Sequence, residues 1–285
     1  MALEKDFAAA AEVMAGAVEA APHWAAGWLL LGDYRTEAGD SDGAMAAYRQ
    51  VEALDVDGAF GAALKLAAHG AERLPGTDTA YVEALFDEYA PRFESELVDG
   101  LGYGVPAVLG RMVGEALAGK RVDRGVDLGC GTGLVGEQIQ GFCARLEGVD
   151  LSERMLAEAR RKGFYDGLVH EELVAFLAAD RGGIGLMTAA DVLNYCGPLP
   201  PVLVAAFARL AAGGLFAFSL ELNAGAGTLL QRRQLRYMHN GDEALADCTA
   251  AGFEIEATLR HPIRNERGVP VDGLLVIVRK PGGAG

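Results

Sequence analysis

The segment that reveals most about the fold reads Val126-Asp127-Leu128-Gly129-Cys130-Gly131-Thr132-Gly133. The apolar run that ends at Leu128 predicts a buried strand, and the glycines after it allow a sharp turn and the close approach of a ligand. An amphipathic stretch begins near Leu134, which predicts a helix directly after the turn. Asp150 ends the next apolar run, where a carboxylate can accept hydrogen bonds from ribose hydroxyls. The segment therefore predicts a site for a nucleotide-like cofactor.

Two kinds of cofactor are compatible with glycines in this order. The stretch from Gly131 to Gly136 satisfies G-x-G-x-x-G, the pattern of dinucleotide-binding enzymes, so a dehydrogenase stays open. In that pattern a helix N-terminus faces an anionic pyrophosphate. Asp127 stands just ahead of the first glycine, and its charge would repel a pyrophosphate but attract the ammonium and sulfonium groups of S-adenosylmethionine. The carboxylate favours S-adenosylmethionine.

The arrangement of an acidic residue before G-x-G-x-G resembles the first motif of class I S-adenosylmethionine-dependent methyltransferases. The resemblance implies that Asp127 and the glycine loop hold the methionine part and that Asp150 binds the ribose. It also implies that Leu151 and Met155 pack against adenine. Glu171 and Glu172 are adjacent candidates to meet the adenine amine, of which Glu172 is preferred, although glutamates that open a helix are favoured by its dipole alone. The cofactor residues implied by this motif and its neighbours are Asp127, Gly129, Gly131, Gly133, Asp150, Leu151, Met155 and Glu172.

From residue 121 onward, apolar runs typical of strands alternate with helical ones. This alternation predicts an α/β fold with a mostly parallel sheet covered by helices on both faces. The last two runs, at 253–259 and 274–278, are expected to form the antiparallel hairpin that ends class I methyltransferase sheets. The expected fold is thus Rossmann-like, and the domain that carries it is predicted at 76–285.

The first 75 residues differ, because they are rich in alanine, helical in period and free of strand-like runs. They are predicted to form an all-α region at 1–75. The spacing of Trp28, Leu31, Gly32, Ala44 and Tyr48 resembles one tetratricopeptide repeat, a helix-turn-helix unit of about 34 residues. With the motifs above, the whole chain resembles bacterial predicted methyltransferases that carry such repeats. The region is either a structural appendage or a surface for a protein partner or self-association.

Composition limits the partners. Forty acidic against 25 basic residues give a net charge of −15, which disfavours DNA and RNA because phosphate backbones are bound by basic patches. The four cysteines show no C-x-x-C pair and no histidines at ligand spacing, so no metal site is expected. Apolar stretches are too short for a membrane span, and we expect a cytoplasmic protein without a leader. Small molecules or proteins remain as substrates.

The segment that opens the second domain follows a linker at 74–79. Phe86-Asp-Glu-Tyr89-Ala resembles a helix that lies over the cofactor mouth in many small-molecule methyltransferases. The resemblance implies that Tyr89 and Arg92 face cofactor or substrate. Their helical spacing is equally compatible with aromatic residues that simply bury one face of a helix.

A further run, Gly185 to Gly197, resembles the fourth motif of one methyltransferase subgroup, although Gly185 stands where that motif has an aspartate. The resemblance implies that Asp191 and Tyr195 border the transferred methyl group. Asp191 is also a candidate helix cap or a turn residue whose polar groups are satisfied within the protein. His239 lies before the last helix, in a region that forms part of the substrate wall in this fold, and is the candidate general base if the acceptor must lose a proton. A surface or capping role for His239 stays open.

The sequence therefore predicts S-adenosylmethionine-dependent methyl transfer to the oxygen or nitrogen of a small molecule. Catalytic roles fall to His239 and Tyr195. The alternatives are a protein methyltransferase, a repeat-based interaction protein whose cofactor-binding fold is silent, and use of the bound cofactor in another reaction.

Overall fold

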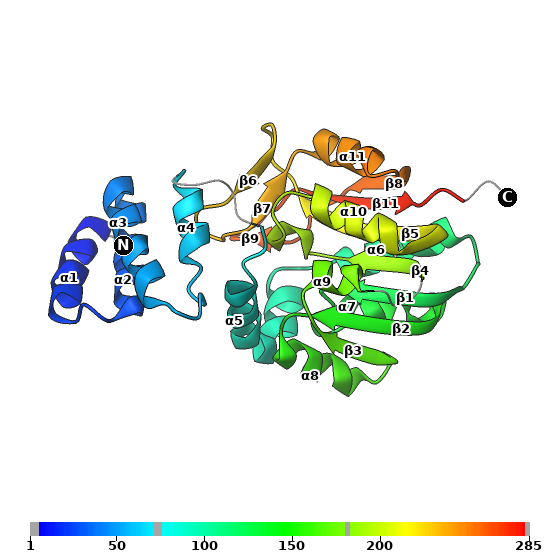
Figure 1. Ribbon diagram of the computed structural model, residues 1–285, viewed down its shortest axis with the longest axis horizontal. Helices are drawn as coiled ribbons and strands as arrows, with labels where there is room; N and C mark the ends of the chain where they lie inside the picture. Colours follow the sequence, from blue (N-terminus) through cyan, green and yellow to red (C-terminus); the bar gives the residue numbers. More distant parts are fainter. Residues whose placement is uncertain (1–5, 71–75, 180–182, 283–285) are drawn as a thin grey trace. The chain divides into compact units, whose positions relative to one another are not determined.

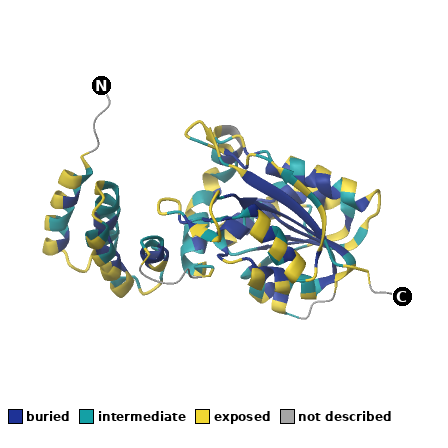
Figure 2. Ribbon diagram, turned by 90° about the horizontal axis from the view of Figure 1, so that it is seen from above, coloured by how far each residue is buried: buried dark blue, intermediate teal, exposed yellow. Residues whose placement is uncertain are grey.

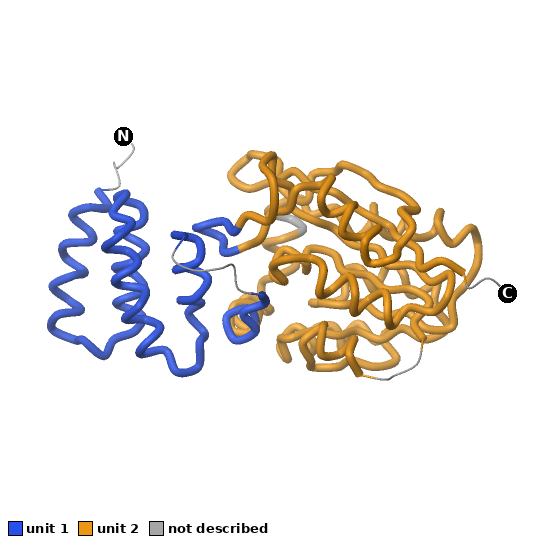
Figure 3. Tube along the Cα trace, turned by 45° about the horizontal axis from the view of Figure 1, so that its top comes forward, with its two compact units in different colours: residues 1–82, 230–235 blue, residues 83–229, 236–285 orange. Residues whose placement is uncertain are grey.

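The computed structural model describes residues 6–70, 76–179 and 183–282. The chain divides into two compact units (Figure 3): unit 1 comprises Met1–Val82 and Leu230–Leu235, and unit 2 comprises Glu83–Leu229 and Arg236–Gly285. The predicted boundary at 75/76 lies beside residues outside the described ranges and stays a prediction. Within those ranges no helix combines the length and hydropathy that crossing a bilayer requires.

Unit 1 is built from helices, which confirms the predicted all-α region. Its four helices from residue 7 to 68 are α1 Phe7–Ala20, α2 Ala25–Ala38, α3 Ser41–Leu54 and α4 Ala62–Ala68. Small and large side chains alternate where the helices meet: Gly32 leaves room for the ring of Tyr48, because a Cβ on Gly32 would lie 2.3 Å from that ring. Tyr48 is fully buried and its hydroxyl donates to Asp33 at 2.9 Å. The packing of α2 against α3 thus depends on the same residues as the repeat-like spacing.

Unit 2 contains a seven-stranded sheet in the order β3-β2-β1-β4-β5-β11-β8 (Figure 1). The first five strands in this order are parallel, and β11 pairs antiparallel with both β5 and β8. The predicted parallel sheet and its closing hairpin are both confirmed. The strands are β1 Val122–Leu128, β2 Cys143–Asp150, β3 Gly167–His170, β4 Ile184–Ala189, β5 Leu210–Glu221, β8 Glu254–Arg260 and β11 Gly273–Arg279.

Helices cover both faces of this sheet, and Figure 2 shows the strands as the buried layer. Side chains alternate along β5: Phe216 and Phe218 join the core under α9–α11, whereas Leu215 and Ala217 join the core under α6 and α7. A strand with apolar side chains on both faces must lie in the middle of the sheet. Its continuous apolar run is also why β5 could be predicted as a strand from the sequence. The helices of unit 2 are α6 Val105–Leu117, α7 Leu134–Ile139, α8 Glu153–Lys162, α9 Leu173–Ala178, α10 Pro200–Arg209 and α11 Gly241–Ala250, and α5 Thr79–Tyr89 spans the division between the units.

The structure shows local features beyond the predicted sheet. The third strand begins at Gly167, and the hydroxyl of Tyr165 just before it donates to the buried carboxylate of Asp127. The polar segment at 222–240 forms two short strands that the sequence did not indicate, β6 Thr228–Leu230 and β7 Tyr237–His239. A small hairpin, β9 Asn265–Glu266 with β10 Val269–Pro270, interrupts the loop before β11. Part of the predicted linker, at 74–75, lies outside the described residues.

Candidate functional site

The predicted site residues lie at one edge of the sheet. Strands β1, β2 and β4 run parallel and end at Leu128, Asp150 and Ala189. Because the carboxyl ends of parallel strands meet at the same edge, the loops that follow them come together there. In open α/β sheets this edge is where ligands bind.

The glycine loop after β1 has a backbone that only glycine adopts easily. Gly129, Gly131 and Gly133 have positive φ angles of 62°, 54° and 94°. A Cβ on Gly129 would also lie 2.4 Å from Cγ2 of Val192, so the loop after β4 packs directly on the glycine loop. The chain then enters α7 at Leu134, as predicted.

Asp150 at the end of β2 reaches this loop. Its Oδ2 accepts the backbone N–H of Gly131 at 2.8 Å, and its Oδ1 accepts that of Ser152 at 2.9 Å. Burial raises the pKa of Asp150, although the two N–H donors act in the opposite direction. The structure therefore brings Asp150 and the glycine loop together, and each carboxylate oxygen keeps a lone pair for a further donor.

Asp127 lies beneath the loop and is almost completely buried. Its Oδ1 accepts from the hydroxyl of Thr188 at 2.6 Å, and its Oδ2 accepts from the hydroxyl of Tyr165 at 2.7 Å. Burial raises the pKa of Asp127 to about 6, against the lowering effect of these two hydroxyls. Asp127 is thus a buried charge near neutral pH, and it also ties β4 and the segment before β3 to the loop.

The raised pKa makes stability depend on pH. We expect the free energy of unfolding of the wild type, relative to Asp127→Asn, to fall by about 2 kcal/mol between pH 4 and pH 7. The folded form holds the proton more tightly than the unfolded chain, so the stabilising contribution is complete below the ordinary pKa of 3.8 and is lost as pH rises through about 6. Urea unfolding of both proteins across this range measures the difference. Parallel stability curves would contradict the assignment.

The three residues predicted to meet adenine follow β2 and β3. Leu151 is half-buried and its carbonyl contacts Nε2 of His170 at 2.6 Å. Met155 is fully buried in α8. Glu172 caps the N-terminus of α9, where its Oε2 accepts the N–H of Ala175 at 2.8 Å. Glu172 thus lies at the helix N-terminus, where the helix dipole favours a carboxylate, and Leu151 is the more open of the two apolar residues.

The part of α5 in unit 2, with the turn after it, lies beside the glycine loop. Asp87 accepts the hydroxyl of Ser152, the N-cap of α8, at 2.6 Å. Phe93 approaches Gly131, since a Cβ there would lie 3.9 Å from its ring. Arg92 is half exposed, 5.3 Å from the ring of Tyr89, and pairs with Glu88 and Glu96 on its own segment. We define the aromatic cluster as the four rings in edge contact across this segment, Phe86, Tyr89, Phe93 and Tyr195.

Asp191 after β4 is held in an unusual way. Its φ angle of 58° is uncommon for a residue with a side chain, and its N–H donates to Oγ of Ser219 at 2.8 Å. Both its carboxylate oxygens accept from Nη1 of Arg264, at 3.1 and 3.0 Å. Asp191 is thus not a helix cap; it anchors a buried ion pair.

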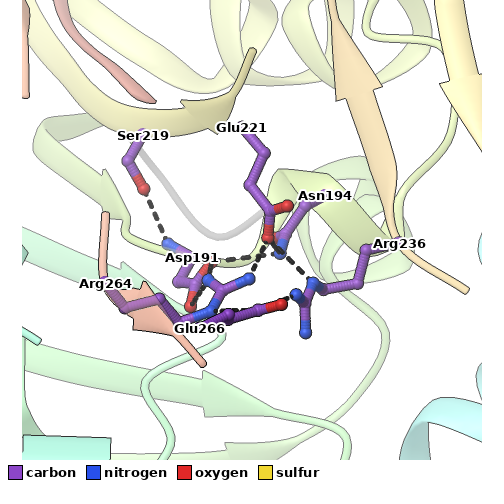
Figure 4. Close-up of polar contacts among 7 residues, drawn as sticks. All are labelled: Asp191, Asn194, Ser219, Glu221, Arg236, Arg264 and Glu266. Atoms are coloured by element: carbon purple, nitrogen blue, oxygen red, sulfur yellow. Dashed lines mark hydrogen bonds and ion pairs between the residues drawn. The ribbon is translucent and has the colours of Figure 1, made fainter. Parts of the chain in front are cut away.

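Arg264 forms ion pairs with three carboxylates, those of Asp191, Glu221 and Glu266 (Figure 4). We call these four residues, together with Arg236, the ionic network. The side chains of Arg264 and Glu221 are 3% and 1% exposed. Arg236 adds ion pairs to Glu221, at 2.8 Å, and to Glu266. Burial alone would raise the pKa of Glu266, but the two guanidinium groups outweigh it and lower this pKa. By formal charge, the three carboxylates of the network exceed its two guanidinium groups by one negative charge.

The two predicted catalytic residues lie near this network. Tyr195 contacts Phe86, with ring centroids 5.3 Å apart, and burial raises the pKa of its hydroxyl. His239 is 2% exposed in β7, and its Nε2 lies 2.9 Å from the carbonyl of Gly197. Because a carbonyl can only accept a hydrogen bond, Nε2 carries the ring proton and Nδ1 of the neutral ring is unprotonated. This buried Nδ1 has no hydrogen-bond partner among the described residues. Burial lowers the pKa of His239, so the ring is neutral near pH 7.

Sequence reasoning missed most of the ionic network. Glu221 offered one signal, because a carboxylate inside an apolar strand needs a buried partner. Arg264 offered none, since it lies 43 and 73 residues from Glu221 and Asp191 in a loop that reads as polar surface. Within the described residues no group of three His, Cys, Asp or Glu side chains is arranged to hold a metal ion.

Comparison with known proteins agrees with the geometry. A family model described as a methyltransferase domain matches residues 126–218. A ubiquinone biosynthesis O-methyltransferase of Thiobacillus denitrificans is 38% identical over 118 residues, which cover 40% of this chain and 49% of that protein. One of Burkholderia vietnamiensis is 33% identical over 38% of this chain and 46% of its own. The chain thus spans about half the length of these relatives.

Solved structures share the fold at low identity. The crystal structure of the [4+2]-cyclase SpnF has a TM-score of 0.59 at 17% identity and covers 74% of this chain and 100% of its own. The 1,6-didemethyltoxoflavin-N1-methyltransferase of Burkholderia thailandensis, with bound 1,6-didemethyltoxoflavin and S-adenosylhomocysteine, has a TM-score of 0.57 at 17% identity, over 74% of this chain and 93% of its own. The fold predicted from the sequence is confirmed.

Proposed function

We propose, from the class I methyltransferase fold of unit 2, that this protein transfers a methyl group from S-adenosylmethionine to the oxygen or nitrogen of a small molecule. The observation that carries the proposal is the contact of Asp150 with Gly131, 2.8 Å between carboxylate and N–H, at the carboxyl edge of a parallel sheet. The match of residues 126–218 to a methyltransferase domain supports it. So do the curated relatives and the toxoflavin methyltransferase, all of which are named for small-molecule methyl transfer.

The residues of the site fit S-adenosylmethionine, which supplies an electrophilic methyl group when bound. Asp150 has free lone pairs for ribose hydroxyls, and Asp127 contributes a buried negative charge beneath the loop, favourable to a cationic ligand. Phe93, whose ring lies close to Gly131, adds an apolar surface at this end of the sheet. Positioning contributes most to an in-line displacement, so rigid loops matter more here than acid–base groups.

Calorimetry with S-adenosylmethionine, S-adenosylhomocysteine and NAD on the same protein tests the proposal. We expect micromolar binding of the two sulfur nucleosides and none of NAD. Tight binding of NAD alone would establish the dehydrogenase instead. Binding of S-adenosylmethionine without release of S-adenosylhomocysteine in the presence of any acceptor would favour a silent cofactor-binding fold.

His239→Ala is expected to lower the turnover number at least tenfold and to change the dissociation constant of S-adenosylhomocysteine less than twofold. The reason is that a neutral imidazole with an unpartnered Nδ1 can take a proton from the acceptor. Steady-state kinetics and calorimetry give the two numbers. His261→Ala, in the loop after β8, is the control. An unchanged turnover number would remove His239 as the base.

We further propose that the helices of unit 1 are tetratricopeptide-like and offer a surface to a protein partner or a second copy of the chain. The spacing of Leu31, Gly32, Ala44 and Tyr48 supports this, because these residues make the contact between α2 and α3. A cytoplasmic location likewise stays a prediction.

A further inference from the structure

Asn194 carries a buried oxygen that the protein itself does not satisfy. The residue is 1% exposed and lies in the turn Leu193–Tyr195 after β4. Its Nδ2 donates to Oδ1 of Asp191 at 3.0 Å and to Oε1 of Glu221 at 3.2 Å (Figure 4). Its Oδ1, on the other branch of the amide, has no hydrogen-bond partner among the described residues.

The orientation of this amide is determined by its neighbours. Rotating it by half a turn would place Oδ1 against two carboxylates and leave Nδ2 without acceptors. Both carboxylates are themselves held by Arg264. An unsatisfied buried acceptor costs about 1–3 kcal/mol, so a protein that orients one rigidly is expected to use it.

Asn194 also lies close to the predicted cofactor site. Val192, two residues earlier, packs on Gly129 of the glycine loop. Tyr195, the next residue, belongs to the aromatic cluster and contacts Phe86. The unsatisfied oxygen therefore belongs to a turn that lies between the cofactor loop and a group of aromatic rings.

The charge around this turn favours one class of methyl acceptor over another. The three carboxylates of the ionic network exceed its two guanidinium groups by one negative charge. Such a surplus stabilises positive charge that develops on an attacking nitrogen, and aromatic faces add to this effect. The same surplus opposes the formation of a phenolate, the reactive form of a phenol.

We propose that Oδ1 of Asn194 accepts a hydrogen bond from the N–H of a neutral aromatic amine and so positions it for methyl transfer. This proposal rests on the proposed function and narrows the atom that receives the methyl group from oxygen or nitrogen to nitrogen. The nitrogen lone pair forms the new bond to the methyl carbon while the carbon–sulfur bond breaks and its electron pair stays on sulfur. The methylated nitrogen, now cationic, loses one proton to Nδ1 of His239. Asn194 is a positioning residue in this scheme.

The first test uses probes that differ in one group. Binding of aniline and toluene to the complex with S-adenosylhomocysteine is measured by calorimetry, and methylation of aniline and phenol by mass spectrometry. We expect aniline to bind at least tenfold more tightly than toluene, and its kcat/KM to exceed that of phenol at least tenfold. Equal binding of aniline and toluene, or faster methylation of phenol, overturns the proposal. Failure of S-adenosylhomocysteine to bind would instead overturn the proposed function.

The second test removes the oxygen. Asn194→Leu is expected to lower kcat/KM for aniline at least thirtyfold and to abolish the preference for aniline over toluene, with the affinity for S-adenosylhomocysteine within twofold of wild type. Gln140→Leu is the control, because Gln140 is an exposed amide in the turn after α7 whose Nε2 donates only to the carbonyl of Glu137. It should keep the preference. A preference retained in Asn194→Leu, or lost equally in both variants, contradicts the role.

Discussion

Arg264→Met is expected to lower the free energy of unfolding by about 4 kcal/mol at pH 8, since removing one partner of a buried ion pair leaves uncompensated charge. Arg264 contacts Asp191, Glu221 and Glu266, and its side chain is 3% exposed. Without it, Arg236 still pairs with Glu221 and Glu266, but Asp191 loses its ion pair. Arg264 is one of the two guanidinium groups that lower the pKa of Glu266 against the raising effect of burial, so this carboxyl takes up a proton at a higher pH in the variant. The loss should therefore be smaller at pH 5 than at pH 8.

Urea denaturation of the wild type and the variant at both pH values measures this effect. Arg161→Met is the control: Arg161 pairs with Glu158 on the surface of α8, its side chain is 73% exposed, and such pairs contribute at most about 0.5 kcal/mol. Adding Glu221→Gln to Arg264→Met removes one of the excess charges and should restore part of the lost stability. A loss in Arg264→Met no larger than in Arg161→Met, or independent of pH, would show that the network does not stabilise the fold.

Asp150→Ala is expected to weaken binding of S-adenosylhomocysteine a hundredfold or more. The carboxylate accepts from Gly131 and Ser152 and is proposed to accept from two ribose hydroxyls, and hydrogen bonds to a charged group contribute about 1.5–3 kcal/mol each. The variant thus loses direct contacts to the ligand and the contact that draws the glycine loop toward β2.

Isothermal calorimetry gives the affinity, and circular dichroism shows whether the fold persists. Asp166→Ala is the control, because the carboxylate of Asp166 likewise accepts from the backbone, from the N–H of Leu146 at 2.8 Å, but in the middle of β2 rather than at its end. It should leave the affinity within threefold of wild type. Wild-type affinity in Asp150→Ala would remove the residue from the cofactor site.

Local patterns were enough to predict the frame of the site. The turn at Gly129 and Gly131 could be predicted from the sequence because positive φ angles are adopted easily only by glycine. Asp150 could be predicted as part of the site because it ends the next strand at the spacing typical of the motif. The alternation of apolar runs likewise predicted the parallel sheet and its final antiparallel hairpin, since each strand buries its own residues.

By itself, then, the amino-acid order determined the helical first region, the sheet and the residues expected at its carboxyl edge. Only the tertiary structure decided how Asp191, Asn194, Glu221 and Arg264 meet, and that Asp127 turns to Thr188 and Tyr165. The physical reason is distance along the chain. Periodicity and turn chemistry act over a few residues, whereas a buried charge is satisfied by whichever partner the folded chain brings near, and these partners are up to 73 residues apart.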